Sequence, residues 1–149
     1  MTKSLPTRSL VLYAEDDTDD RELLTEIFAE YAAIIELVTF GTGQELLDYL
    51  KSLHPLQPQP CLVILDINMP ILDGKATLKT LRQTDRFDSV PVVLFTTSTL
   101  PHEAAFAEKH SAGFVTKPIH LGQVHQIVDQ MLQHCTDSFK RRVERHRRE

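Results

Sequence analysis

The sequence predicts an α/β fold in which five parallel strands form one doubly wound sheet of the (βα)5 type. Two observations support this prediction. Five short apolar runs alternate with segments whose apolar residues recur at helical spacing. The runs are continuously apolar, which is typical of strands that helices cover on both faces. A chain of 149 residues is long enough for one such domain with its own core.

The five predicted strands are short and rich in aliphatic and β-branched residues. They cover residues 9–14, 34–40, 61–65, 91–95 and 113–116. Gly41-Thr42-Gly43 ends the second strand, and Asp73-Gly74 is a turn signal after the third. The alternating prolines of residues 54–60 predict a surface loop, because proline lacks a backbone donor and has a fixed φ.

The segments between and after the strands predict amphipathic helices. A short helix is expected over 102–109. The apolar positions of the other four are Leu23, Leu24, Ile27, Phe28 and Tyr31; Leu46, Leu47, Leu50 and Leu53; Ala76, Leu78 and Leu81; and Leu121, Val124, Ile127, Val128, Met131 and Leu132. We therefore predict an N-terminal extension over 1–8, a domain over 9–134 and a charged tail over 135–149. The tail is expected to be disordered or to extend the last helix.

Charge and cysteine content exclude several classes of function. The net charge is −5, of which the last ten residues contribute +4 and the rest −9. An acidic body argues against a nucleic-acid-binding face, and no apolar run has the ~20 residues of a membrane span. Two cysteines without a CxxC pair suit a reducing cytoplasm. The seven histidines lack the spacing of a zinc site.

Polar residues follow four of the predicted strands. Glu15 and Asp16 follow the first strand, Asp66 the third, Thr96 the fourth and Lys117 the fifth. Ligands of open parallel sheets lie beyond the carboxyl ends of the strands, so these side chains are expected to converge at one edge. Carboxylates packed closely repel one another unless a hard cation lies between them, and oxygen ligands of this kind suit Mg²⁺.

Four short motifs at these strand ends resemble the receiver domain of two-component response regulators. The resemblance covers about residues 8–134, with order and spacing in agreement. The motifs are Tyr13-Ala14-Glu15-Asp16-Asp17; Leu65-Asp66-Ile67-Asn68-Met69-Pro70 with Asp73-Gly74; Phe95-Thr96-Thr97-Ser98; and Phe114-Val115-Thr116-Lys117-Pro118. The resemblance implies the flavodoxin-like receiver fold and a stand-alone response regulator, because too few residues follow the last helix for an output domain.

The resemblance also implies a role for each residue of the predicted site. Asp66 is the expected phosphoacceptor. Glu15, Asp16, Asp66 and the backbone carbonyl of Asn68 are the expected Mg²⁺ ligands. Lys117 is expected to pair with Asp66 before transfer and with a phosphoryl oxygen afterwards.

Three further residues take roles from the same resemblance. Thr96 is expected to donate a hydrogen bond to the phosphoryl group, and Phe114 to change rotamer as the switch aromatic, although core packing explains Phe114 about as well. Pro118 follows Lys117 in a bond that the family holds cis. Asp17, Asp19 and Asp20 are assigned to helix capping and solvation.

Two alternative functions belong to other classes. A phosphatase with an aspartyl-phosphate intermediate needs a second acid two residues after the nucleophile, where this chain has Asn68. A phosphorylation-independent adaptor would not need Asp66, Thr96 and Lys117 together. The expected partners are a sensor histidine kinase or a histidine phosphotransfer protein, followed by an unknown protein target or a phosphorelay step. A homodimer remains open.

Overall fold

A computed structural model describes residues 7–118, 124 and 126–149 of the chain. The described residues form one five-stranded parallel sheet. Its strands are β1 (Ser9–Ala14), β2 (Ile35–Phe40), β3 (Leu62–Leu65), β4 (Val92–Thr96) and β5 (Gly113–Thr116), in the order β2-β1-β3-β4-β5. The predicted fold class is thereby confirmed, with strand bounds that differ by one residue at β2, β3 and β4.

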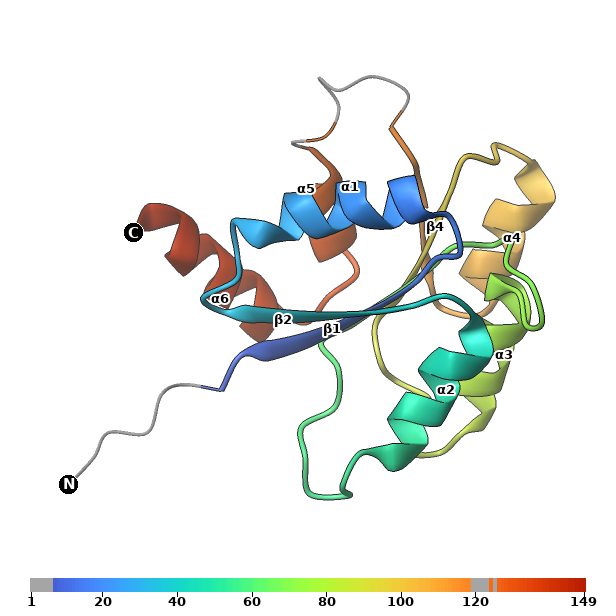
Figure 1. Cartoon of the computed structure of the whole chain (residues 1–149), viewed down its shortest axis with the longest axis horizontal. Coiled ribbons are helices and arrows are strands. Elements are labelled where there is room, and N and C mark those ends of the chain that lie inside the picture. The colour runs from blue at the N-terminus through green and yellow to red at the C-terminus, as the bar shows by residue number, and fades with distance from the viewer. Residues whose placement is uncertain (1–6, 119–123, 125) are drawn as a thin grey trace.

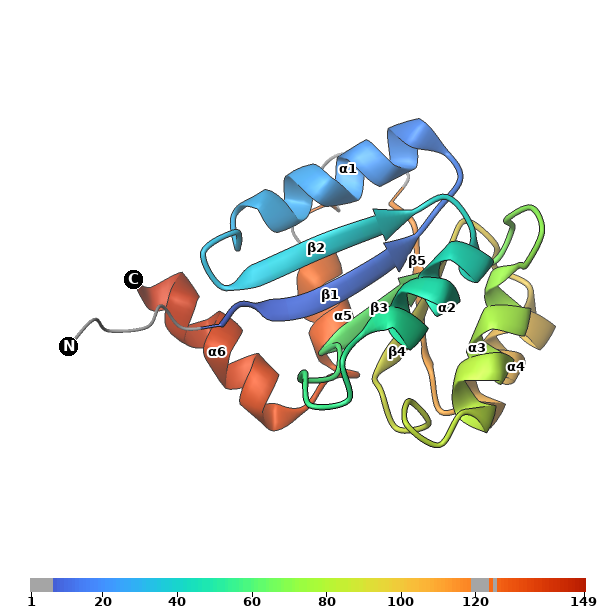
Figure 2. The ribbon, with the colours of Figure 1, turned by 60° about the horizontal axis from the view of Figure 1, so that its bottom comes forward.

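Helices cover both faces of the sheet (Figures 1 and 2). They are α1 (Thr18–Ala29), α2 (Gly43–Ser52), α3 (Gly74–Gln83), α4 (Pro101–Lys109), α5 (Ile127–Leu132) and α6 (Asp137–Arg148). α1, α5 and α6 pack on one face, and α2, α3 and α4 on the other. Alternate residues of a strand therefore belong to different cores, as Val11 and Tyr13 do on one side and Leu12 and Ala14 on the other.

Side-chain caps explain where four of the helices begin. Asp17, Thr42, Asp73 and Thr136 each lie just before a helix, and each accepts a hydrogen bond from a backbone N–H three residues on. Such a cap satisfies one of the four N–H groups that the first turn leaves free. The assignment of Asp17 to capping and of Asp73 to a turn agrees with this geometry.

The C-terminal segment differs from its expectation, because it is neither disordered nor a continuation of α5. It turns at Cys135 and begins a separate helix, α6, with Thr136 as its cap. Phe139 and Val143 are one helical turn apart and are both buried in the α1–α5 core. Two apolar residues at that spacing give the basic segment one buried stripe, and this packing holds it as a helix.

The polar side chains of α6 also form contacts. They attach this helix to the amino ends of the strands, at the opposite end of the sheet from the predicted site. The Arg142 guanidinium donates to the Ser9 hydroxyl at 2.8 Å, at the start of β1. Arg147 donates to the Tyr31 hydroxyl at 2.9 Å and pairs with Asp129 of α5 at 2.7 Å. α6 therefore lies where β1 begins, and it connects the end of α1 to α5.

Three further expectations concern Leu121, the Lys117–Pro118 bond and membrane-spanning helices. Leu121, expected on the last helix, lies outside the described residues. The Lys117–Pro118 bond is trans, since no peptide bond of the described chain is cis; the cis bond implied by the resemblance is therefore not found. Within the described ranges, no helix is both long enough and apolar enough to cross a bilayer.

Candidate functional site

The carboxyl edge of the sheet brings most of the predicted site residues together. Glu15 and Asp16 follow β1, and Asp66 follows β3, its neighbour in the sheet. One carboxylate oxygen from each of the three lies within 4.8 Å of the other two. Glu15 is fully buried and Asp66 is 6% exposed, whereas Asp16 is exposed to solvent. This open-sided oxygen cluster suits a hard divalent cation that keeps several of its waters.

Lys117 supplies the positive charge of the site. Its Nζ lies 2.5 Å from Oε1 of Glu15, 2.8 Å from Oδ2 of Asp20 and 3.3 Å from Oδ1 of Asp66. An ammonium has three N–H donors, and three carboxylates from β1, α1 and β3 surround this one. The Lys117 side chain is only 9% exposed, so its charge is balanced by carboxylates and not by water.

Burial and charge shift the pKa values of the groups in this cluster. Burial raises the pKa of Glu15 to about 7, with the Asp66 carboxylate adding to the rise and the Lys117 hydrogen bond opposing it. Burial lowers the pKa of Lys117, but its hydrogen bonds to Asp20 and Glu15 and the nearby Asp66 outweigh this effect, so the pKa lies above its ordinary value. Lys117 therefore remains an ammonium throughout the physiological range.

Thr96 occupies the end of β4, beside the start of the Lys117 loop. Its side chain is buried, and its hydroxyl accepts a hydrogen bond from the Ser98 N–H at 3.1 Å. Its backbone carbonyl accepts from the Lys117 N–H at 2.7 Å, which joins the ends of β4 and β5. Thr96 and Lys117 are thus joined through their backbones, and the contact of the Thr96 hydroxyl with a phosphoryl group remains a prediction.

The other two predicted residues lie at the margins of the cluster. The Asn68 side chain is exposed in the loop between β3 and α3, and carbonyl ligation by this residue stays a prediction. Phe114 on β5 is half-buried and packs against the α2–α4 core. It also lines a cavity of about 320 Å³ with Lys117 and Gln126, and a change of its rotamer stays a prediction.

Gly74 explains how closely α3 approaches the end of β3, where Asp66 lies. Its N–H donates to the Ile67 carbonyl at 3.0 Å, and a Cβ at this position would overlap the backbone carbonyl oxygen of Asp66. Only glycine permits this approach, which helps to fix the backbone that carries Asp66. Asp73-Gly74 is therefore more than a turn signal, because it also positions the site.

Sequence reasoning missed two residues of this cluster. Asp20 was assigned to capping, yet its carboxylate pairs with Lys117. Tyr13 is fully buried, and its hydroxyl donates to Oε1 of Glu15 at 3.2 Å. A signal for Tyr13 was present, since residues two apart in a strand share a face. Asp20 had a weaker signal, since it lies in the helical turn that directly follows the Glu15-Asp16 pair.

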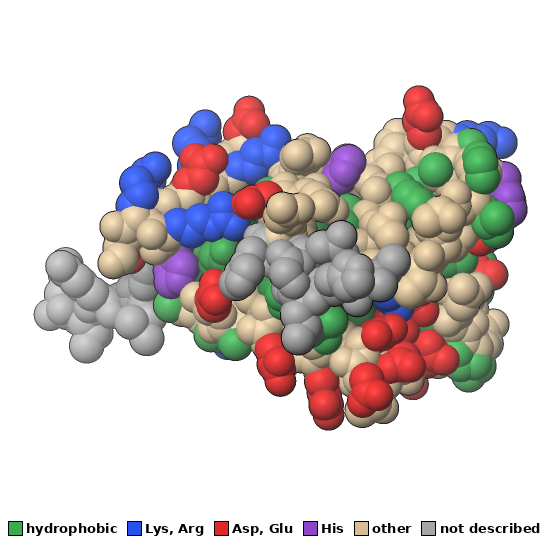
Figure 3. Space-filling view, turned by 90° about the horizontal axis from the view of Figure 1, so that it is seen from above, with side chains coloured by type: hydrophobic (Ala, Val, Ile, Leu, Met, Phe, Trp, Pro, Cys, Tyr) green, Lys and Arg blue, Asp and Glu red, His purple; other side chains and the backbone are tan. Residues whose placement is uncertain are grey.

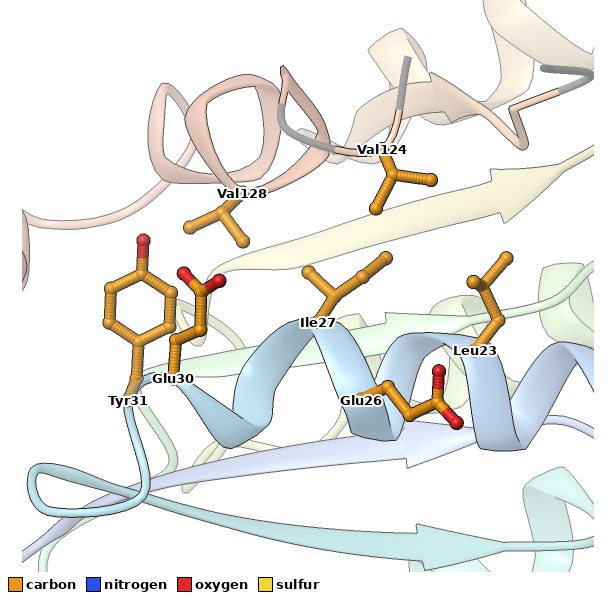
Figure 4. A pocket seen from close by; sticks show the side chains of 7 residues that line it. All are labelled: Leu23, Glu26, Ile27, Glu30, Tyr31, Val124 and Val128. Atoms are coloured by element: carbon orange, nitrogen blue, oxygen red, sulfur yellow. The ribbon is translucent and has the colours of Figure 1, made fainter. Parts of the chain in front are cut away.

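The surface beside the site combines an apolar groove with acidic residues. The groove, of about 270 Å³, lies between α1 and the residues that lead into and form α5 (Figure 4). It is lined by Leu23, Glu26, Ile27, Glu30, Tyr31, Val124 and Val128. Leu23 also lines a small cavity of about 60 Å³ next to Lys117, so the groove leads toward the site. Figure 3 shows acidic side chains along one side of this face, with most Lys and Arg gathered at another corner.

The fold and the carboxylate–lysine edge together define a class of signalling domain, and comparison with known proteins identifies it. Residues 11–129 match the family model described as the response regulator receiver domain. The chain therefore belongs to the response regulator receiver family, as the four motifs predicted. Receiver domains bind a divalent metal in an acidic pocket, and the Glu15, Asp16 and Asp66 cluster fits such a pocket.

Curated relatives show the same relationship at moderate identity. The chain is 28% identical over 122 residues to "Response regulator Rcp1" of Synechocystis, covering 80% of this chain and 83% of that protein. It is also 28% identical over 131 residues to "Chemotaxis protein CheV2" of Helicobacter pylori, covering 87% of this chain. The match spans only 41% of CheV2, so this chain corresponds to less than half of that relative's length.

Solved structures agree with the fold. The phosphorylated cyanobacterial phytochrome response regulator RcpA superposes with a TM-score of 0.77 at 25% identity, covering 89% of this chain and 96% of that one. The response regulator RPA3017, from red-light signaling of R. palustris, gives a TM-score of 0.73 at 27% identity, with 87% and 94% covered. The Mn²⁺-bound form of Rcp1 gives a TM-score of 0.73 at 24% identity, covering 84% of this chain and 92% of that one.

Proposed function

We propose that this receiver accepts a phosphoryl group on Asp66 from a phosphohistidine of a sensor histidine kinase or a histidine phosphotransfer protein. The observation that carries the proposal is the contact of one buried ammonium, Lys117, with Asp66 at the edge of the metal-binding cluster. Transfer needs a carboxylate nucleophile, counter-charge for the phosphoryl oxygens and an open side for the donor. Asp66, Lys117 and the exposed side of the cluster at Asp16 would supply these three.

The proposed reaction is an in-line transfer between two side chains. A carboxylate oxygen of Asp66 forms a bond to phosphorus while the phosphorus–nitrogen bond of the donor breaks, and the electron pair stays on the imidazole nitrogen. Glu15, Asp16, Asp66 and the Asn68 carbonyl would hold Mg²⁺, which neutralises charge on the phosphoryl oxygens. Lys117 would exchange a carboxylate for a phosphoryl oxygen, and Thr96 would donate its hydroxyl to another.

The signal would then pass by protein contact or by onward transfer of phosphate. The phosphorylated RcpA structure supports phosphorylation of the fold, since this chain superposes on 96% of it. The apolar groove beside α1, whose lining includes Glu26 and Glu30, supports contact with a helical phosphodonor. Transfer from the phosphohistidine of a sensor kinase would place this reaction in the cytoplasm.

Mass measurement after incubation with acetyl phosphate and Mg²⁺ tests the proposal. We expect one added phosphoryl group of about 80 Da on the wild type and none on Asp66→Asn. Asp48→Asn is the matched control, because Asp48 is exposed on α2 and bonds only to Gln44 among the described residues. Stoichiometric labelling of Asp66→Asn would contradict the assignment, and turnover of a phosphomonoester would favour a phosphatase.

The metal site has a separate test. Thermal melts with and without millimolar Mg²⁺ are expected to differ, because a ligand that binds only the folded state stabilises it. Asp16→Ala should remove this difference, since Asp16 is the exposed member of the cluster and can be changed without altering the core. An unchanged melting temperature of the wild type would count against the site.

A further inference from the structure

Glu15 is the one carboxylate of the cluster that is fully buried, and three donors surround it. Oε1 accepts from the Tyr13 hydroxyl at 3.2 Å and from Lys117 Nζ at 2.5 Å. Oε2 accepts from the Asp17 backbone N–H at 3.3 Å. The carboxylate thus has one contact to a neutral hydroxyl, one to a charged group and one to the backbone.

These three donors differ in how they respond when the site is used. In the proposed reaction Lys117 turns toward the phosphoryl group, which withdraws its contact from Glu15. The Tyr13 hydroxyl cannot follow, because it sits on β1 with no exposed surface and its ring packs edge-on against Phe95 at 6.4 Å between centroids. Tyr13 therefore remains the side-chain donor to Glu15 in both states.

We propose that Tyr13 is a positioning residue for the divalent cation, acting through its hydrogen bond to Glu15. The inference rests on the proposed metal site and adds to it a residue that holds a ligand without touching the metal. A donor to Oε1 restricts how the carboxylate can rotate, and this helps to keep a Glu15 oxygen within 4.8 Å of carboxylate oxygens of Asp16 and Asp66. Partners of this kind change metal affinity by about 10- to 100-fold when removed.

Tyr13→Phe removes one oxygen atom and keeps the ring against Phe95. With Mn²⁺ alone as the probe, electron paramagnetic resonance of the free ion measures the dissociation constant directly and requires no phosphorylation. We expect Tyr13→Phe to bind Mn²⁺ about tenfold more weakly than the wild type. Its far-ultraviolet circular dichroism should match that of the wild type.

Tyr31→Phe is the matched control, because it also removes one hydroxyl and one hydrogen bond, here to Arg147 on α6. It should leave the Mn²⁺ dissociation constant unchanged. A purely structural role of Tyr13 would lower the melting temperature in EDTA without changing Mn²⁺ affinity, and that outcome would overturn the proposal. Absence of Mn²⁺ binding to the wild type would instead refute the metal site of the proposed function.

A second variant guards against loss of the fold. Should Tyr13→Phe fail to fold, Tyr13→His keeps an aromatic ring with an N–H donor at a shorter reach. Because the imidazole is shorter than the phenol, it does not bring a donor to the place of the Tyr13 hydroxyl, so we expect this variant, with native circular dichroism, to bind Mn²⁺ more than about threefold more weakly than the wild type. A smaller loss of affinity would show that Mn²⁺ binding needs no hydroxyl at this position and would overturn the proposal.

Discussion

Lys117 is the residue on which the charge balance of the site depends. It lies between Glu15 and Asp66, which are both buried, and it also contacts Asp20. Removing one partner of a buried ion pair leaves an uncompensated charge, which is far more costly than removing an exposed one. The resting site is therefore stable only while the ammonium, or another cation, occupies it.

Lys117→Met should accordingly destabilise the protein by about 3 kcal/mol in EDTA. Millimolar Mg²⁺ should restore part of this loss, because a cation bound to Glu15, Asp16 and Asp66 replaces the missing positive charge. Urea denaturation with and without Mg²⁺ measures both effects. Lys79→Met, on the exposed side of α3, is the control and should change stability by less than about 0.5 kcal/mol. Equal losses for the two variants would contradict this account.

For single residues, the sequence identified the chemical groups of the site but not every residue that contacts them. Asp66, Thr96 and Lys117 could be predicted because each one ends a strand, and parallel strands end at one edge of the sheet. Asp20 could not be separated from Asp17 and its other acidic neighbours. All of them suit the first turn of a helix, and only the packing of α1 decides which one faces Lys117.

Among the elements, α3 depends on one glycine for its distance from β3. Gly74→Ala would place a methyl group against the Asp66 backbone carbonyl, and backbone cannot move aside as a flexible side chain can. We expect a loss of about 2 kcal/mol and slower phosphorylation by acetyl phosphate. Gly41→Ala is the control, since the atoms nearest to its Cβ would lie at 3.8 and 3.9 Å. Native stability of Gly74→Ala in chemical denaturation would refute the close approach.

The charged composition of α6 makes this helix hard to predict from the sequence. Only Phe139 and Val143 mark its buried stripe within twelve mostly charged residues, so the sequence alone predicted a tail that is disordered or that extends the preceding helix. The helical structure of α6 depends on a complementary surface at the start of β1 and the end of α1. A local sequence pattern does not reveal such a surface. The periodicity of α1, α2, α3 and α5 was sufficient because each of these helices has a broader apolar stripe.

Phe139→Ala tests whether α6 contributes to the core. The side chain is 3% exposed, and loss of a buried aromatic ring costs about 3–5 kcal/mol. We expect a loss in this range, measured by urea denaturation. The Mg²⁺-induced shift in melting temperature should stay unchanged, since α6 lies at the opposite edge of the sheet. Arg141→Ala, at an exposed position of α6, should have little effect.

The whole molecule has one core on each face of its sheet, and the core against α1 and α5 includes ionisable groups. Burial raises the pKa of the Cys135 thiol to about 12. An unfolded cysteine ionises near pH 8.5, so above that pH the unfolded chain loses a proton that the folded chain keeps. The unfolded state then binds fewer protons, and stability falls as pH rises from about 8.5 toward 12.

This pH dependence gives a measurable difference between wild type and Cys135→Ala. The wild type should lose about 1 kcal/mol more than the variant between pH 7.5 and 9.5, because only the wild type contains the buried thiol. Urea denaturation at both pH values gives the comparison, and each protein serves as its own reference for the cavity that alanine creates. Parallel pH profiles would show that Cys135 does not contribute.

β3 is a short strand that connects a cysteine at one end of the sheet to the acidic site at the other. Cys61 directly precedes it and Asp66 directly follows it, so the two residues lie about 16 Å apart at 3.3 Å per residue. Cys61 is partly exposed, whereas Cys135 is buried with a raised pKa and should react slowly with thiol reagents. A probe attached to the native sequence would therefore enter at Cys61. It would report on events at Asp66 from a fixed distance without obstructing the acidic edge.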